Sequence, residues 1–106
     1  MARALINVPA TAKRGEIIEI KALISHEMEP GFRPDNTGRI MPRDIITDFI
    51  CKYNGQEIFR AELFSAVSAN PFFAFSTIAT ESGTISFEWT GDNGFSATGS
   101  ADIAVE

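Results

Sequence analysis

The stretch that decides the fold is Gly15-Glu16-Ile17-Ile18-Glu19-Ile20-Lys21-Ala22-Leu23-Ile24-Ser25-His26. On one side of an extended chain fall Ile18, Ile20, Ala22 and Ile24. On the other side fall Ile17, Glu19, Lys21 and Leu23. This alternation with a period of two, rich in β-branched residues, is typical of a half-buried strand.

Glycine, proline and asparagine divide the rest of the chain into similar pieces. We expect six further strands, at residues 3–8, 44–53, 56–63, 72–80, 84–90 and 95–105. Asn54-Gly55 separates two of them and favours a type I′ hairpin turn, which needs positive φ twice. Strands at spacings of about 8–12 residues, without a helical period, predict an all-β fold. We therefore expect an immunoglobulin-like antiparallel β-sandwich of about seven strands.

Length and charge exclude several classes of protein. The chain has 106 residues, which predicts one domain over 1–106. It carries 9 basic and 14 acidic residues, a net charge of −5. We therefore expect neither nucleic acid nor an anionic membrane as partner. One Cys and one His are too few for a zinc cage or an internal disulfide, so no metal or cofactor is expected.

No segment approaches the roughly 20 apolar residues of a membrane span. The first nine residues contain no long apolar run, so we expect no secretory signal peptide. Taken alone, the expected lack of a signal peptide predicts a cytoplasmic location. A protein can nevertheless be exported folded on a partner that carries the signal.

Residues 25–43 break the strand pattern with Pro30-Gly31, Pro34, Gly38 and Pro42. A loop of this length is either functional or mobile, or else it is a long hairpin or a crossover between sheets. Its three arginines are Arg33, Arg39 and Arg43. They suit an oxyanion, or they pair locally with Asp35 and Asp44.

Few residues suggest catalysis. His26 and Cys51 are a conceivable dyad, but Cys51 falls on the apolar face of its strand, where a free Cys acts as a small hydrophobe. His26 lies beside Glu27 and Glu29 and suits a metal or a charged group only weakly. We predict no catalytic and no metal-binding residues.

Apolar side chains occur on both faces of some predicted strands. Alternation sends Phe73 and Phe75 to one side and Phe72 to the other, and Ile17 and Leu23 lie opposite the buried side of their strand. One side is the core, and the other is expected to form an exposed apolar patch for a partner. Trp89 is expected to fill the core.

Several blocks resemble the SoxZ family of sulfur-oxidation carrier subunits. In order they are His26-Glu27-Met28-Glu29, Gly31-Phe32-Arg33, Ile40-Met41-Pro42-Arg43-Asp44-Ile45-Ile46, Phe49-Ile50-Cys51-Lys52-Tyr53-Asn54-Gly55, Ser65-Ala66-Val67-Ser68-Ala69-Asn70-Pro71 and Glu81-Ser82-Gly83-Thr84. The family often has Pro after the loop His, where this chain has Glu27, so the loop geometry there is open.

The resemblance implies a single SoxZ-like β-sandwich that pairs with SoxY in the SoxYZ heterodimer of thiosulfate oxidation. SoxY holds sulfur intermediates on a cysteine near its C-terminus, on a flexible arm. The expected role is to bind SoxY and help present that arm to the other Sox enzymes, with transient contacts to them. The complex is periplasmic and SoxY carries the export signal. A homo-oligomer is expected as an alternative when the chain is alone.

On this interpretation the chain is not an enzyme, and Cys51 is structural. We predict an exposed loop cluster of His26, Met28, Arg33 and Arg43, with Phe72 and Phe73 as anchors for the partner. The alternative is a small metal-binding or redox enzyme that uses His26 and the loop carboxylates. A third, generic alternative is an adhesion-type sandwich module.

Overall fold

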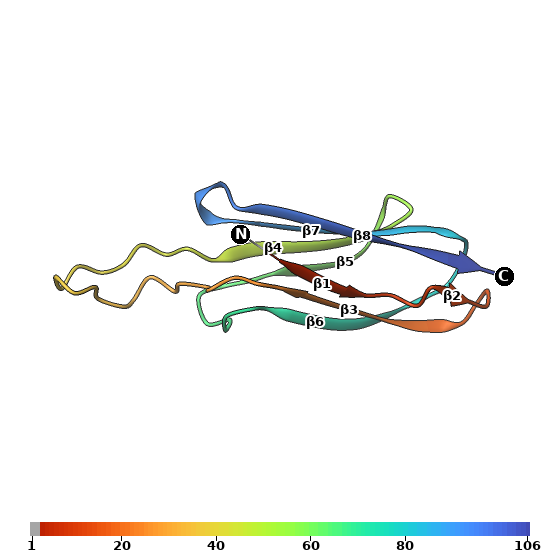
Figure 1. The fold of residues 1–106 in the computed structure, drawn as a ribbon, viewed down its shortest axis with the longest axis horizontal. Helices are drawn as coiled ribbons and strands as arrows, with labels where there is room; N and C mark the ends of the chain where they lie inside the picture. Colours follow the sequence, from red (N-terminus) through yellow and green to blue (C-terminus); the bar gives the residue numbers. More distant parts are fainter. Residues whose placement is uncertain (1–2) are drawn as a thin grey trace.

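The computed structural model describes residues 3–106 and shows two β-sheets packed face to face (Figure 1). The smaller sheet has the strand order β1-β3-β6 and the larger one β2-β8-β7-β4-β5. The strands are β1 (Ala4–Asn7), β2 (Thr11–Ala12), β3 (Ile17–Ile24), β4 (Ile46–Tyr53), β5 (Gln56–Glu62), β6 (Phe72–Ile78), β7 (Gly83–Gly91) and β8 (Ser96–Val105). The only helix among these residues is the short 3₁₀ turn η1 (Asp92–Gly94). The predicted immunoglobulin-like β-sandwich is confirmed.

The smaller sheet follows the alternation of the sequence. Every second residue of β3, from Ile18 to Ile24, is buried. The strand pairs antiparallel with β1, where Leu5 lies opposite Leu23, and with β6, where Leu23 lies opposite Phe72. The other side of β3, from Ile17 to Leu23, therefore faces outward.

The larger sheet departs from strict alternation at the start of β4. Ile45 and Ile46 are neighbours in the sequence and are both fully buried, whereas Thr47 is only half-buried. A β-bulge between Ile46 and Asp48 causes this difference, because one extra residue shifts the face on which later side chains fall. The turn at Asn54-Gly55 is as predicted, with φ of 50° and 83°.

One strand was not expected. Thr11–Ala12 forms β2, which pairs parallel with the end of β8, so the sandwich is not purely antiparallel. Backbone bonds from Ala104 N–H to Ala10 O and from Glu106 N–H to Ala12 O hold it there. Two residues are too few for a periodic pattern, so the sequence carried no signal for this strand.

Aromatic side chains fill the space between the sheets. Phe49 of β4 is fully buried and stacks on Phe73 of β6 at 4.4 Å between ring centroids. Phe59 of β5 stacks on Phe75 of β6 at 4.3 Å. Trp89 is fully buried, which confirms its predicted place in the core. These stacks join the two sheets across the side of the sandwich where β5 and β6 lie.

The molecule is elongated, 59 Å long and 20 by 19 Å across. Figure 1 shows why: the chain between β3 and β4 runs far beyond the ends of both sheets and returns. Between Arg3 and Glu106, no helix has the length and apolarity needed to cross a bilayer.

Candidate functional site

The segment between β3 and β4 is a two-stranded extension, here called the long hairpin (residues 25–45). Backbone bonds join Glu29 to Asp44 in both directions at 2.9 Å. Further out, Met41 N–H donates to Arg33 O at 2.8 Å, and an isolated bridge pairs Pro34 with Ile40. The segment is therefore a long hairpin, and it also connects the smaller sheet to the larger one.

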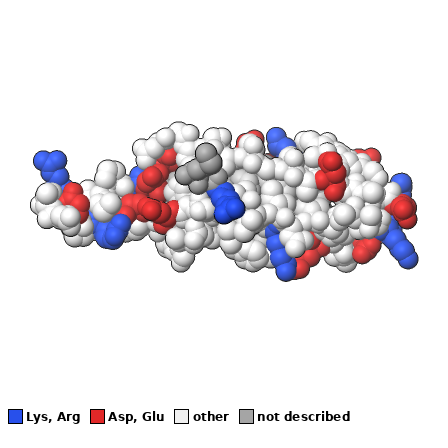
Figure 2. Space-filling view, viewed as in Figure 1, with Lys and Arg blue, Asp and Glu red and all other residues white. Residues whose placement is uncertain are grey.

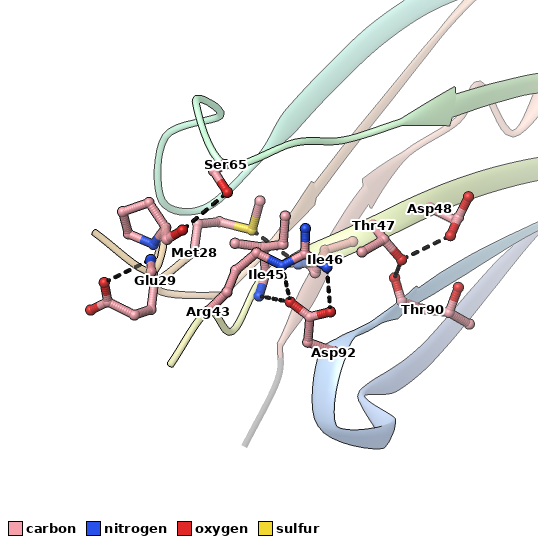
Figure 3. Close-up of polar contacts among 12 residues, drawn as sticks. Met28, Glu29, Arg43, Ile45, Ile46, Thr47, Asp48, Ser65, Thr90 and Asp92 are labelled. Carbon is pink, nitrogen blue, oxygen red and sulfur yellow. Dashed lines mark hydrogen bonds and ion pairs between the residues drawn. The ribbon is translucent and has the colours of Figure 1, made fainter. Parts of the chain in front are cut away.

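Met28 anchors the base of the long hairpin (Figure 3). We expected it in an exposed cluster, but it is only 3% exposed and belongs to the core. Its φ of 55° turns the backbone so that the thioether points inward, where the sulfur accepts the Ile46 N–H at 3.3 Å. The prediction of an exposed Met28 is wrong. A segment rich in polar and turn-forming residues can still place one apolar side chain in the core.

Arg43 ties the returning half of the long hairpin to the turn between β7 and β8. Its guanidinium donates to both carboxylate oxygens of Asp92, Nε and Nη2 each at 2.8 Å. Asp92 also accepts the Ile45 N–H at 3.1 Å. The Arg43 hydrogen bond, helped by the bond from Ile45, lowers the pKa of Asp92. Arg43 does pair with a carboxylate, but not with the neighbouring Asp44 that we expected.

Arg33 is held within the long hairpin by Glu29. The Arg33 Nη2 atom lies 2.5 Å from Glu29 Oε1, and this hydrogen bond lowers the pKa of the carboxyl. Asp35, the partner we expected, instead accepts the hydroxyl and N–H of Thr37, and the hydroxyl bond lowers its pKa. Asp35 thus stabilises the turn at the tip of the long hairpin.

His26 lies at the base of the long hairpin, where its backbone N–H, its Nδ1 atom and its ring each contact another residue. Its Nδ1 accepts the Met28 N–H at 3.0 Å, its own N–H donates to Asn70 Oδ1 at 2.9 Å, and its ring meets Phe95 edge-on at 4.8 Å. Cys51 is fully buried in β4, and burial raises the pKa of its thiol to about 12. No hydrogen bond joins the side chains of His26 and Cys51, so the structure gives no nucleophile–base pair. The prediction of a structural, inward Cys51 is confirmed.

The two predicted aromatic anchors lie on opposite faces of β6. Phe72 is 57% exposed, whereas Phe73 is half-buried and stacked on Phe49. Phe73 therefore belongs mainly to the core, and Phe72 is the one whose ring is exposed. That either residue binds a partner stays a prediction.

Two residues that are prominent in the structure were not among the predicted site residues. Phe32 and Ile40, on the two sides of the long hairpin, are 76% and 60% exposed. Figure 2 shows basic and acidic side chains close together along this projection, with uncharged surface between them. Large apolar residues inside a turn-rich segment were the available signal, because such a segment has no core of its own to bury them.

Metal ligands do not gather in the part of the chain that the structure describes. No group of three or more His, Cys, Asp or Glu side chains there is placed to hold a metal ion. Two of the carboxylates around His26 are also engaged, since Glu29 binds Arg33 and Asp92 binds Arg43.

A family comparison matches almost the whole chain. The family described as "Sulphur oxidation protein SoxZ" matches residues 6–102, which include the second half of β1, β2 to β7, the long hairpin and most of β8. No curated protein sequence gives a significant match.

Solved structures share the fold at low sequence identity. A superoxide reductase (neelaredoxin) from Ignicoccus hospitalis has 14% identity and a TM-score of 0.76, covering 97% of this chain and 80% of its own. The sulfur carrier protein SoxY from Chlorobium limicola f thiosulfatophilum has 10% identity and a TM-score of 0.66, covering 97% and 78%. The CARDB domain of a Pyrococcus furiosus protein, in complex with di-metal ions, has 13% identity and a TM-score of 0.59, covering 100% and 94%. At these identities the likeness concerns the fold alone.

Proposed function

The chain belongs to the SoxZ family of sulfur-oxidation proteins, and we propose that it is the non-catalytic subunit of a SoxYZ heterodimer. In this role it binds SoxY and helps present the C-terminal cysteine arm of SoxY to the other Sox enzymes. The sulfur intermediates of thiosulfate oxidation are then held by SoxY. The complex works in the periplasm, exported by the signal of its partner.

The observation that carries the proposal is the long hairpin itself. Its base is fixed by buried Met28 and by the two-pronged Arg43–Asp92 pair, while its outer part exposes Phe32 and Ile40. Exposed apolar side chains on a fixed support are typical of a protein-binding surface, because covering them with a partner removes apolar area from water. The fixed base limits the ordering entropy that binding costs.

The reactive groups of the chain also favour a non-catalytic role. The single Cys51 is fully buried and its thiol pKa is raised to about 12, so it is a poor nucleophile at neutral pH. A thiol that exchanges sulfur intermediates with several enzymes must instead be accessible. The buried thiol therefore supports the proposal that the partner carries the sulfur chemistry.

The alternative of a metal or redox enzyme lacks a supporting contact at the base of the long hairpin. His26 Nδ1 is already an acceptor for Met28 N–H, and the carboxylates of Glu29 and Asp92 bind arginines. A metal held by Nδ1 and these two carboxylates would have to displace these bonds. Metal analysis of the purified chain, together with thiosulfate turnover by the chain alone, tests this alternative directly.

The experiment for the proposed function is a titration of SoxY by calorimetry. The variant Phe32→Ala with Ile40→Ala removes the exposed apolar side chains of the long hairpin, and we expect binding at least tenfold weaker than for the wild type. Ile50→Ala is the matched control, since Ile50 is half-buried on the outer face of β4, in the larger sheet. Equal affinity of the double variant and the wild type would contradict the proposal.

A further inference from the structure

The strand β6 forms an edge of the smaller sheet that lacks the usual protection against pairing. It pairs with β3 on one side and with no described strand on the other. The sequence contains no charged residue between Glu62 and Glu81, so the whole strand is uncharged. Natural edge strands usually carry charges, proline or bulges, or are very short. Here β5 carries Glu57, Arg60 and Glu62, β1 has four residues and β2 has two.

The backbone groups on this free edge are set by the pairing with β3. Ile24 N–H donates to Pro71 O, and Ala79 N–H donates to Glu16 O, which fixes the phase of the ladder. In an antiparallel pair the residues alternate between bonding to the neighbour and pointing away from it. Four residues therefore direct N–H and C=O to the free edge: Phe72, Ala74, Ser76 and Ile78.

We propose that β6 pairs with β6 of a second copy of this chain, antiparallel and centred on Phe75, to form a two-fold dimer with a continuous six-stranded sheet. In this register Phe72 lies opposite Ile78 of the second copy, and Ala74 lies opposite its Ser76. All four free-edge residues of each copy then bond across the interface. Side chains of the outer face meet outer-face side chains, as the period of two requires.

The outward-facing apolar residues of the smaller sheet explain why the partner strand comes from a second copy of this chain. They lie in two cross-strand rows near the two ends of the sheet. One row contains Leu5, Leu23 and Phe72, and the other contains Ile17 and Ile78. Pairing around Phe75 joins the first row of one copy to the second row of the other. The resulting row reads Leu5, Leu23, Phe72, then Ile78 and Ile17 of the second copy.

Four of the seven large hydrophobic residues that are exposed between Arg3 and Glu106 thereby fall into continuous rows, with Phe72 and Ile78 in direct cross-strand contact.

Charge in the neighbouring row is compatible with this pairing. Lys21 lies opposite Ala74, and Glu19 lies opposite Ser76. In the dimer Lys21 of one copy and Glu19 of the other stand at the two ends of a row whose middle positions are the small Ala74 and Ser76. The charges are opposite in sign, so no like charges face each other in the paired rows.

The test is the mass of the isolated full chain by sedimentation equilibrium, from about 10 µM to about 1 mM, because a seven-residue edge is smaller than a standard interface. We expect twice the monomer mass of 11.6 kDa at the upper end. Ala74→Lys places two added charges close to the two-fold axis and should leave a folded monomer. Ser100→Lys, on an exposed position of β8, is the matched control and should stay dimeric. A monomeric wild type, or an Ala74→Lys variant as dimeric as the wild type, would overturn the proposal.

Hydrogen exchange on the wild type decides the matter even if Ala74→Lys fails to fold. The amides of Ala74, Ser76 and Ile78 should become protected as the concentration rises, and concentration-independent exchange at all three would refute the pairing. These self-association experiments are independent of the proposed function, because binding of SoxY is tested separately by co-elution. Phe72 is also a predicted contact for SoxY, so we expect SoxY to dissociate the dimer.

Discussion

Replacement of Met28 by Ala should destabilise the domain strongly, although Met28 lies in a segment that looks like a surface loop. The side chain is 3% exposed, and a buried Met→Ala change typically costs about 2–5 kcal/mol. The change also leaves the Ile46 N–H without its sulfur acceptor. A lost partner for a buried donor costs about 1–3 kcal/mol, although the two losses overlap at one site. We expect a total of about 3–5 kcal/mol.

Met28→Leu separates the two contributions. Leucine keeps most of the buried volume but offers no acceptor, so we expect a loss of only about 1–2 kcal/mol. The control is Met41→Ala, which alters the same residue type in the same long hairpin at a half-buried position. It should cost less than about 1.5 kcal/mol, in the range of ordinary substitutions.

Urea unfolding followed by tryptophan fluorescence measures these differences, since Trp89 is buried in the core. Total stabilities of such domains are about 5–15 kcal/mol, so Met28→Ala removes a large share. It should lower the Tm by more than about 10 °C. If the free energies of unfolding of Met28→Ala and the wild type differ by less than about 0.5 kcal/mol, Met28 does not anchor the long hairpin.

Two further predictions concern titratable groups. Because Arg43 lowers the folded pKa of Asp92, the pair stabilises the protein above the unfolded Asp pKa of about 3.9, and this contribution disappears as the pH falls through the lower folded pKa. Asp92→Asn should therefore reduce the stability of the folded protein at pH 7, and the stability of this variant should fall less steeply than that of the wild type below about pH 4. Urea unfolding midpoints measured across this pH range test the prediction. An equally steep fall in the variant and the wild type at acid pH would contradict it. Cys51, with a thiol pKa of about 12, should react with an aromatic disulfide reagent at pH 8 only as fast as the domain opens, but within minutes in denaturing urea. Rapid reaction of the native protein would show that Cys51 is accessible.

The sequence predicts the strands well where side chains alternate. The buried face of β3 and the Asn54-Gly55 turn follow from local pattern and backbone chemistry alone. The bulge at Ile46–Asp48 does not, because it depends on how β4 pairs with β7 across the sheet. The two-residue β2 is likewise defined only by the distant β8.

The site was harder to predict because its contacts are partly long-range. Three arginines in one segment indicated carboxylate partners, and Arg33 and Arg43 do have them. The actual partner of Arg43 is Asp92, 49 residues away in the sequence. Met28 was expected outside and lies inside, since its positive φ is not visible in the sequence. The exposure of Phe32 and Ile40 follows from the projection of the long hairpin beyond the sheets.

The central claim is that this chain is one half of a heterodimer with SoxY. Size-exclusion chromatography with light scattering, on the full chain mixed with SoxY, tests it most directly. We predict a single peak with the mass of a one-to-one complex, at the expense of the peaks of both free proteins. Two peaks at the masses of the separate proteins, at concentrations well above 10 µM, would contradict the claim.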